Sequence, residues 1–396
     1  MKRLPSRWPR FLSAYALSIA SDRWFDAAIP ALSLLLLGDL HGVALHLMSF
    51  GCARLLVSLG APGLIARRPS RPWLAIVNLA TAAAMIGLGT VLMTQAPQSM
   101  LRLGIVLAGT VLGAAAGVEA VVFGATVKAT VPPERMGSAQ AHLEVADSVI
   151  SLVAPLLATW LFLAWQPGPV LVAAGLVYVV VSALRWPCVI PAPGVRDHRL
   201  GILARLTIPF QEGERRHISI GVLTASLLVA LSVPVAAERL GALGLSPALS
   251  GVVIAATSLG SIPAALLAGR VAHRLDGARL VLVWALAGAS LFLLGLQFSV
   301  NLPLTLALAA GFDACVCWVF VVAGTARTKG EETVDLLGIA STMSVLGATV
   351  PVVAGGILLG FPFGRATVGV SALACVVACA LSARPLTSLG GGRVAT

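Results

Sequence analysis

The chain has 396 residues, of which 58% are hydrophobic and only 11% are charged. A typical soluble domain is about one-quarter charged, and a soluble chain this apolar could not cover its surface with polar groups. The composition therefore excludes a soluble enzyme, a disordered chain and a fibrous protein. The net charge of +11 does not indicate a nucleic-acid-binding protein, because the basic residues are scattered between long apolar stretches. These stretches are too long for the alternating strands of a membrane barrel.

The apolar stretches predict an all-α polytopic membrane protein with twelve spans, each about 20 residues or slightly longer. The first six spans are 11–38, 41–65, 73–94, 103–127, 138–164 and 168–190. The second six are 218–240, 247–269, 279–297, 302–325, 335–360 and 365–383. We therefore expect an N-terminal lobe at 1–190, a linker at 191–217 that is rich in proline and arginine, and a C-terminal lobe at 218–396.

The basic residues predict the orientation of these spans. If the N-terminus is cytoplasmic, 22 of the 27 Lys and Arg residues lie on the cytoplasmic side, three lie outside, and Arg23 and Arg54 lie within spans. The positive-inside rule then predicts a multi-pass protein of the inner (plasma) membrane with both termini in the cytoplasm. The apolar stretch from Phe11 to Ala20 is also typical of a signal peptide, but the apolar character resumes at Ala27, which favours an uncleaved span.

An internal repeat indicates duplication of a six-helix unit. The segment 63–72 after the second span shares Gly, Ala and Arg at matching offsets with 269–278 after the eighth span. The segments 132–137 and 330–338 form a second, weaker match about half a chain apart. Parallel repeats of this kind occur in transporters. The two Gly-and-basic loops resemble the short loop of the major facilitator superfamily, which implies that fold, with two six-helix lobes.

Charged residues within the first span indicate a cation site. Ser18, Asp22 and Asp26 are four residues apart and so share one face of a helix. A hydroxyl and two carboxylates suit a divalent cation, and the same acids could bind protons that drive antiport. In the alternative interpretation Arg23 neutralises Asp26 or pairs with Asp147, and acts as a counter-ion or gate.

The fourth and fifth spans carry three more acids. Glu119 lies beside a run of small residues that allow helices to approach closely, and we expect it to be either functional or the buried partner of Arg23 or Arg54. Glu144 and Asp147 are three residues apart and share a face. Of these two, the deeper Asp147 is the stronger candidate for a functional residue, and Glu144 is a possible gate or counter-ion.

The tenth span contains a possible second metal site. Asp313 and Cys317 are four residues apart and could hold one transition metal between a carboxylate and a thiolate. In the alternative, which we favour, Cys317 is a small apolar packing residue. Cys375 and Cys379 have no acid nearby and are expected to pack.

Three segments resemble the ferroportin family, the iron-exporting branch of the major facilitator superfamily. The segment Ser21-Asp-Arg-Trp-Phe-Asp26 resembles the first helix of that family, 134–155 resembles its fifth helix, and 244–251 resembles the segment that leads into its eighth. The resemblance implies export of ferrous iron or a related divalent metal by alternating access. It also implies that Asp22 is a metal ligand, with Ser18, Asp26 and Asp147 at further site or gate positions.

The chain departs from the family in its C-terminal lobe. Relatives hold a second site with a cysteine on helix 7 and a histidine on helix 11. Here the helix 7 position falls at or near Pro234, and no histidine follows His273. Helix 6 offers only Tyr178 and Ser182 as polar residues. We therefore do not expect the second site in its usual form.

We expect a transporter rather than an enzyme, because no phosphate-binding glycine motif and no catalytic triad or H-E-x-x-H motif occurs. The leading hypothesis is a ferroportin-like metal exporter. The alternative is a proton-coupled major facilitator exporter of organic cations or drugs, and a third is a membrane scaffold or sensor. The expected partners are a divalent metal ion, possible coupling protons and the lipid bilayer, without nucleic acid or a resident cofactor, and we expect a monomer.

Overall fold

A computed structural model of the chain describes residues 8–32, 41–60, 70–94, 96–132, 135–185, 214–245, 249–271 and 278–329, together with 373, 374, 376 and 377. Ten long helices make up almost all of this part of the chain. They are α1 (Trp8–Leu32), α2 (His41–Gly60), α4 (Ser70–Met93), α5 (Gln98–Thr130), α6 (Met136–Ala164), α7 (Pro167–Arg185), α9 (Glu214–Ala242), α10 (Ser250–Val271), α11 (Ala278–Gln297) and α12 (Leu302–Lys329).

Each of these ten helices corresponds to one of the first ten predicted spans. The largest difference at a start is at α5, which begins at Gln98 and not at residue 103. Helix α9 begins at Glu214, so that Arg215 and Arg216 belong to a helix and not to the linker. The predicted spans 335–360 and 365–383 lie outside the described residues, except for the four residues near the C-terminus. The count of twelve spans therefore stays a prediction.

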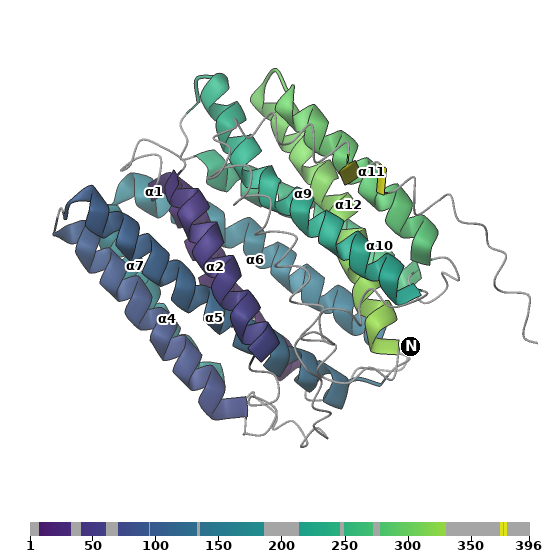
Figure 1. The fold of residues 1–396 in the computed structure, drawn as a ribbon, viewed down its shortest axis with the longest axis horizontal. Coiled ribbons are helices and arrows are strands. Elements are labelled where there is room, and N and C mark those ends of the chain that lie inside the picture. Colours follow the sequence, from purple (N-terminus) through teal and green to yellow (C-terminus); the bar gives the residue numbers. More distant parts are fainter. Residues whose placement is uncertain are drawn as a thin grey trace, which may run out of the picture.

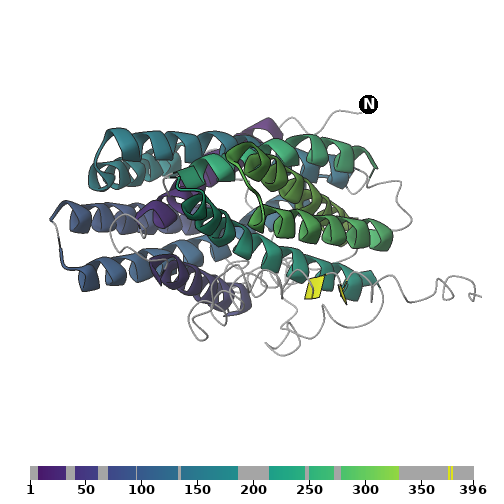
Figure 2. The same ribbon diagram turned by 90° about the horizontal axis from the view of Figure 1, so that it is seen from above.

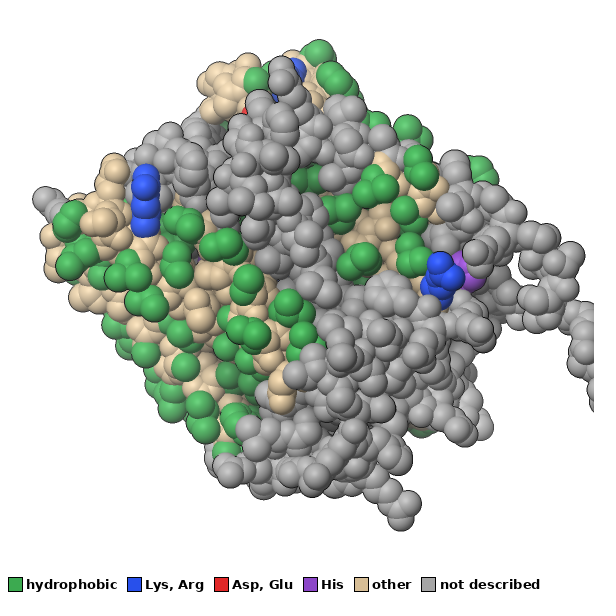
Figure 3. All heavy atoms as spheres, viewed as in Figure 1, with side chains coloured by type: hydrophobic (Ala, Val, Ile, Leu, Met, Phe, Trp, Pro, Cys, Tyr) green, Lys and Arg blue, Asp and Glu red, His purple; other side chains and the backbone are tan. Residues whose placement is uncertain are grey.

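The helices have the length and composition of membrane spans. Six of them contain windows long and apolar enough to cross a membrane. Large apolar side chains are exposed along their outer faces, among them Leu56, Leu107, Trp284 and Leu291. Figure 3 shows one such face, on which hydrophobic side chains predominate and charged ones are isolated. Outward-facing apolar side chains are stable only next to lipid, and the chain is therefore a multi-pass membrane protein.

The helices form two groups that meet along α6 and α10. Helices α1, α2, α4, α5 and α7 lie on one side, and α9, α11 and α12 lie on the other (Figure 1). Helix α6 packs closely against α10 and also against α1. Seen from above, the helices of both groups run roughly along one common direction (Figure 2). The arrangement therefore places the acids of α6 where the two groups meet.

Glycines allow the closest helix contacts. Gly109, Gly113 and Gly117 recur every four residues on α5 and face α2, where a Cβ atom at Gly113 would overlap the carbonyl oxygen of Phe50. On α10, a Cβ atom at Gly260 would overlap a backbone carbonyl of α12. Without a strong hydrophobic force between helices in lipid, such backbone proximity provides much of the packing energy. The result is that α5 is held beside α2, and α12 beside α10.

Candidate functional site

Helix α1 contributes two polar side chains to neighbouring helices. The first is Ser18, which is buried and donates a hydrogen bond of 2.6 Å from its hydroxyl to Oε2 of Glu119 on α5. Glu119 is itself buried. A buried carboxylate in an apolar domain needs such donors, because an unsatisfied charge there costs several kcal/mol. Glu119 therefore has a hydroxyl partner from α1, a pairing that the sequence did not predict.

The second contribution of α1 is an ion pair with α6. The guanidinium of Arg23 donates from Nε and from one terminal nitrogen to the carboxylate of Asp147, over 2.9 to 3.1 Å. The hydroxyl of Ser151 donates a further hydrogen bond of 3.3 Å to Asp147. Both side chains remain partly accessible, at 38% for Arg23 and 24% for Asp147. One predicted alternative, the pairing of Arg23 with Asp147, is thus present in the structure.

Two further acids interact with this ion pair. The charge of Glu144 on α6 interacts with those of Asp147, Arg23 and Asp313. Asp313 lies on α12, in the other group of helices, and also interacts with Asp147 and Arg23. The charges of Glu144 and Asp313 thus interact with both members of the pair, whose direct contact is between Arg23 and Asp147. Charges within membrane spans are costly and typically mark a path for ions or protons.

A hydrogen bond joins the two groups of helices close to these acids. The hydroxyl of Ser261 on α10 lies 2.8 Å from that of Ser148 on α6, and both side chains are buried. The Sγ atom of Cys317 on α12 lies 3.6 Å from the backbone oxygen of Ser261. Neither serine was predicted as a site residue. The only sequence signal is that Ser148 follows Glu144 by one turn, and nothing in the sequence relates it to Ser261.

The possible second metal site at Asp313 and Cys317 stays a prediction. Cys317 is buried among small apolar side chains of α10, including Ala264, Ala265 and Ala268, as expected for a packing residue. Within the described residues, no three His, Cys, Asp or Glu side chains lie close enough together to hold a metal ion. Asp313 and Cys317 share a helix face but have no third such ligand among these residues.

The side chains of two predicted ligands on α1 are not among those that the structure describes. Helix α1 contains Asp22 one turn after Ser18 and Asp26 one turn later, but the side chains of Asp22 and Asp26 lie outside the described residues. The described part of the site therefore consists of Ser18 with Glu119 and Arg23 with Asp147. These two pairs lie on either side of Asp22 along α1.

The chain is similar to solved transporter structures over almost its whole length. A bacterial homologue of the iron transporter ferroportin in an outward-facing state has a TM-score of 0.70 and 17% sequence identity, covering 96% of this chain and 100% of that one. The inward-facing state of a bacterial ferroportin homologue has a TM-score of 0.63 and 16% identity, covering 97% of this chain and 100% of that one. The fucose:proton symporter of E. coli has a TM-score of 0.63 and 12% identity, covering 95% and 97%.

The chain shares the fold of these solved transporter structures. Structural similarity at such low sequence identity shows that the fold is shared, but it does not show which substrate this chain carries. No protein-family model matches the chain, and no curated protein matches it in sequence. The solved structures named above are those of transporters.

Proposed function

We propose that the chain is a ferroportin-like secondary transporter that exports ferrous iron or a related divalent transition metal by alternating access. The observation that carries the proposal is the polar character of α1 within an apolar membrane domain. Its Ser18 and Arg23 each contact an intramembrane carboxylate, and Asp22 lies between them in the sequence. Intramembrane acids that do not serve an ion path are rare, because each one makes insertion more costly.

The described contacts are compatible with metal binding at Ser18. A hydroxyl has one proton and two acceptor lone pairs. Ser18 uses its proton in the bond to Glu119, so its oxygen keeps acceptor capacity for a cation. We propose that Asp22 supplies the charged ligand, with Ser18 and Asp26 as further oxygen ligands. Arg23 and Asp147 then act as a counter-ion pair beside the metal path.

The experiment that tests the proposal is the substitution Asp22→Asn. It preserves the shape and one acceptor oxygen of the side chain but removes the charge that a divalent cation needs. We expect the affinity for Fe²⁺ or Co²⁺, measured by titration calorimetry on purified protein, to fall at least about tenfold, which corresponds to about 1.4 kcal/mol. Glu238→Gln on α9 is the matched control, because this exposed acid lies at the end of a helix. Affinity in the control should not change.

The same titration tests for carboxylate ligands through pH. Metal ions and protons compete for carboxylates, so the affinity of the wild-type protein should rise between about pH 5.5 and about pH 8. An Asp22→Asn variant that binds metal as the wild type does would show that Asp22 is not a ligand. A flat pH profile of the wild type would argue against carboxylate ligation as a whole.

A second candidate function is proton-coupled export of organic cations. It is supported by Glu144 and Asp313, two acids from different groups of helices whose charges interact and which could take up protons in turn. Proteoliposomes with an imposed pH gradient distinguish the two functions. Metal transport without dye accumulation favours the metal exporter, and accumulation of a cationic dye without metal transport favours the second candidate.

We also propose that both termini and the 191–217 linker are cytoplasmic. This proposal rests on the distribution of the 27 Lys and Arg residues along the sequence and on the positive-inside rule. It places the connection between α6 and α7 at the outer surface.

A further inference from the structure

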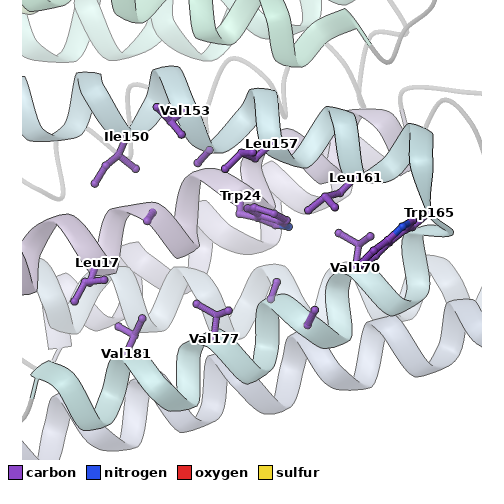
Figure 4. A pocket seen from close by; sticks show the side chains of 14 residues that line it. Leu17, Trp24, Ile150, Val153, Leu157, Leu161, Trp165, Val170, Val177 and Val181 are labelled. Carbon is purple, nitrogen blue, oxygen red and sulfur yellow. The ribbon is translucent and has the colours of Figure 1, made fainter.

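An apolar pocket with a volume of about 310 Å³ lies between α1, α6 and α7. Its wall consists of leucine, isoleucine, valine, alanine and tryptophan side chains (Figure 4). The lining residues are Leu17, Ala20, Trp24, Ile150, Val153, Ala154, Leu157, Leu161, Trp165, Val170, Ala173, Ala174, Val177 and Val181. Among the described residues, no charged side chain, hydroxyl or carboxamide lines it, and the polar side-chain atoms of this described lining are two indole nitrogens.

The pocket is long and narrow. On α7 its lining extends from Val170 to Val181, which at 1.5 Å per residue is about 16 Å of helix. On α6 and the residue that follows it, the lining extends from Ile150 to Trp165, which is about 22 Å at the same rise per residue. Figure 4 shows these side chains facing one another along the two helices, with Trp24 of α1 between them. A slot parallel to membrane-spanning helices is also parallel to the acyl chains of the surrounding lipid.

The pocket opens sideways onto the apolar outer face of the protein. Val153 and Leu157 on α6 and Val177 on α7 line it and are about half exposed. Both of these α6 residues belong to a segment with the length and hydropathy of a membrane span, Ser138–Ala158. Trp165, at the end of α6, is also exposed, and tryptophan at a helix end is typical of the membrane–water interface.

We propose that this pocket binds one acyl chain of a membrane phospholipid. A metal ion, sugar or peptide would lose hydration there without gaining polar contacts, whereas an acyl chain that enters from the bilayer exchanges one apolar environment for another and loses no hydration.

The bound acyl chain would lie directly behind the candidate site. Trp24 follows Arg23 on α1, and Ile150 lies one turn after Asp147 on α6, so the pocket and the ion pair use the same two helices. An acyl chain in the slot fills the space between α1, α6 and α7 and supports the contact between Arg23 and Asp147. This inference does not depend on which substrate the protein transports.

The test uses two valines of α7 that differ in one respect. Val177 lines the pocket and is 54% exposed, whereas Val180 is 58% exposed and does not line it. Val177→Trp should fill the slot, and Val180→Trp adds the same bulk to the lipid-facing surface. Each protein is reconstituted into vesicles of phosphatidylethanolamine and phosphatidylglycerol that contain a phosphatidylglycerol with a diazirine within its acyl chain. After illumination, the labelled peptides are identified by mass spectrometry.

We expect the wild-type protein and Val180→Trp to carry concentrated labels on α1, α6 and α7 at the lining residues. In Val177→Trp, labelling of the lining residues should be at least about tenfold lower than in the wild-type protein. Its helical circular dichroism should be unchanged. Labels spread evenly around all exposed helices, or equal labelling in the two variants, would overturn the proposal. Labelling of the lining by a diazirine fatty acid but not by the phospholipid would also overturn it.

Discussion

The residues that determine the chemistry of α1 are held by partners far away in the sequence. Ser18 binds Glu119, and Arg23 binds Asp147, over separations of 101 and 124 residues. The pair of Arg23 and Asp147 has more acidic than basic neighbours among the described residues, because Glu144 and Asp313 also interact with it. Arg23 thus interacts with two acids besides Asp147, which leads to an asymmetric prediction.

Removal of Arg23 should be more harmful than removal of the charge of Asp147. Arg23→Ala leaves three interacting carboxylates without their guanidinium, at a cost of about 1–2 kcal/mol given the partial exposure of the pair. Asp147→Asn leaves Arg23 with Glu144 and Asp313 nearby, so its cost should be smaller. The measurement is the apparent melting temperature in detergent. The double variant should be more stable than Arg23→Ala, and strictly additive shifts would contradict the coupling.

At the scale of elements, the close contacts between helices depend on positions without a side chain. Gly113 allows α5 to reach the backbone of α2, and Gly260 allows α10 to reach the backbone of α12. Helices α10 and α12 also carry Ser261 and Asp313, so their spacing determines where these two residues lie. Changes at Gly260 should therefore affect both stability and the site.

We expect Gly260→Ala to lower the stability in detergent by about 1–3 kcal/mol, because the new methyl group overlaps the carbonyl of Ala310 and the two helices must separate. Gly87→Ala on α4 is the control. A Cβ atom there has no neighbour within 4 Å, so this substitution should be neutral or stabilise the helix by up to about 1 kcal/mol. Equal melting temperatures for the two variants would show that the contact at Gly260 can relax.

At the scale of the whole molecule, the contact between α6 and α10 joins the two groups of helices. The hydrogen bond between Ser148 and Ser261 lies in this contact. In alternating access the two halves of a transporter rock against each other around the substrate site. A covalent bond across this contact should therefore stop transport without affecting the fold.

The test is the pair Ser148→Cys and Ser261→Cys in a Cys317→Ala background, because the Cys317 thiol lies next to Ser261. Oxidation should cross-link the pair, since the two hydroxyl oxygens are only 2.8 Å apart, and transport in proteoliposomes should stop until a reductant is added. Each single cysteine variant should be insensitive to the oxidant. Full transport by the cross-linked protein would show that α6 and α10 do not separate during the cycle.

The positions of ten helices could be predicted from the sequence, and the structure confirms them to within a few residues at most ends. The reason is that a membrane span is a local property, set by about 20 consecutive apolar residues. The charged residues that lie within the spans could also be identified from the sequence. The predicted spans beyond residue 330, and the roles of Asp22 and Asp26, remain predictions.

What the tertiary structure decided is which of these residues meet. The sequence offered Arg23 or Arg54 as the partner of Glu119 and offered Asp26 or Asp147 as the partner of Arg23. It did not relate Ser148 to Ser261 at all. Only the structure pairs Glu119 with Ser18 and Arg23 with Asp147. A periodic pattern determines the faces of one helix, but the rotation and depth at which it meets another depend on small residues such as Gly113 and Gly260 packing against distant backbone. The sequence alone therefore specified the helices and their charges, whereas packing between helices far apart in the chain determined the polar pairs.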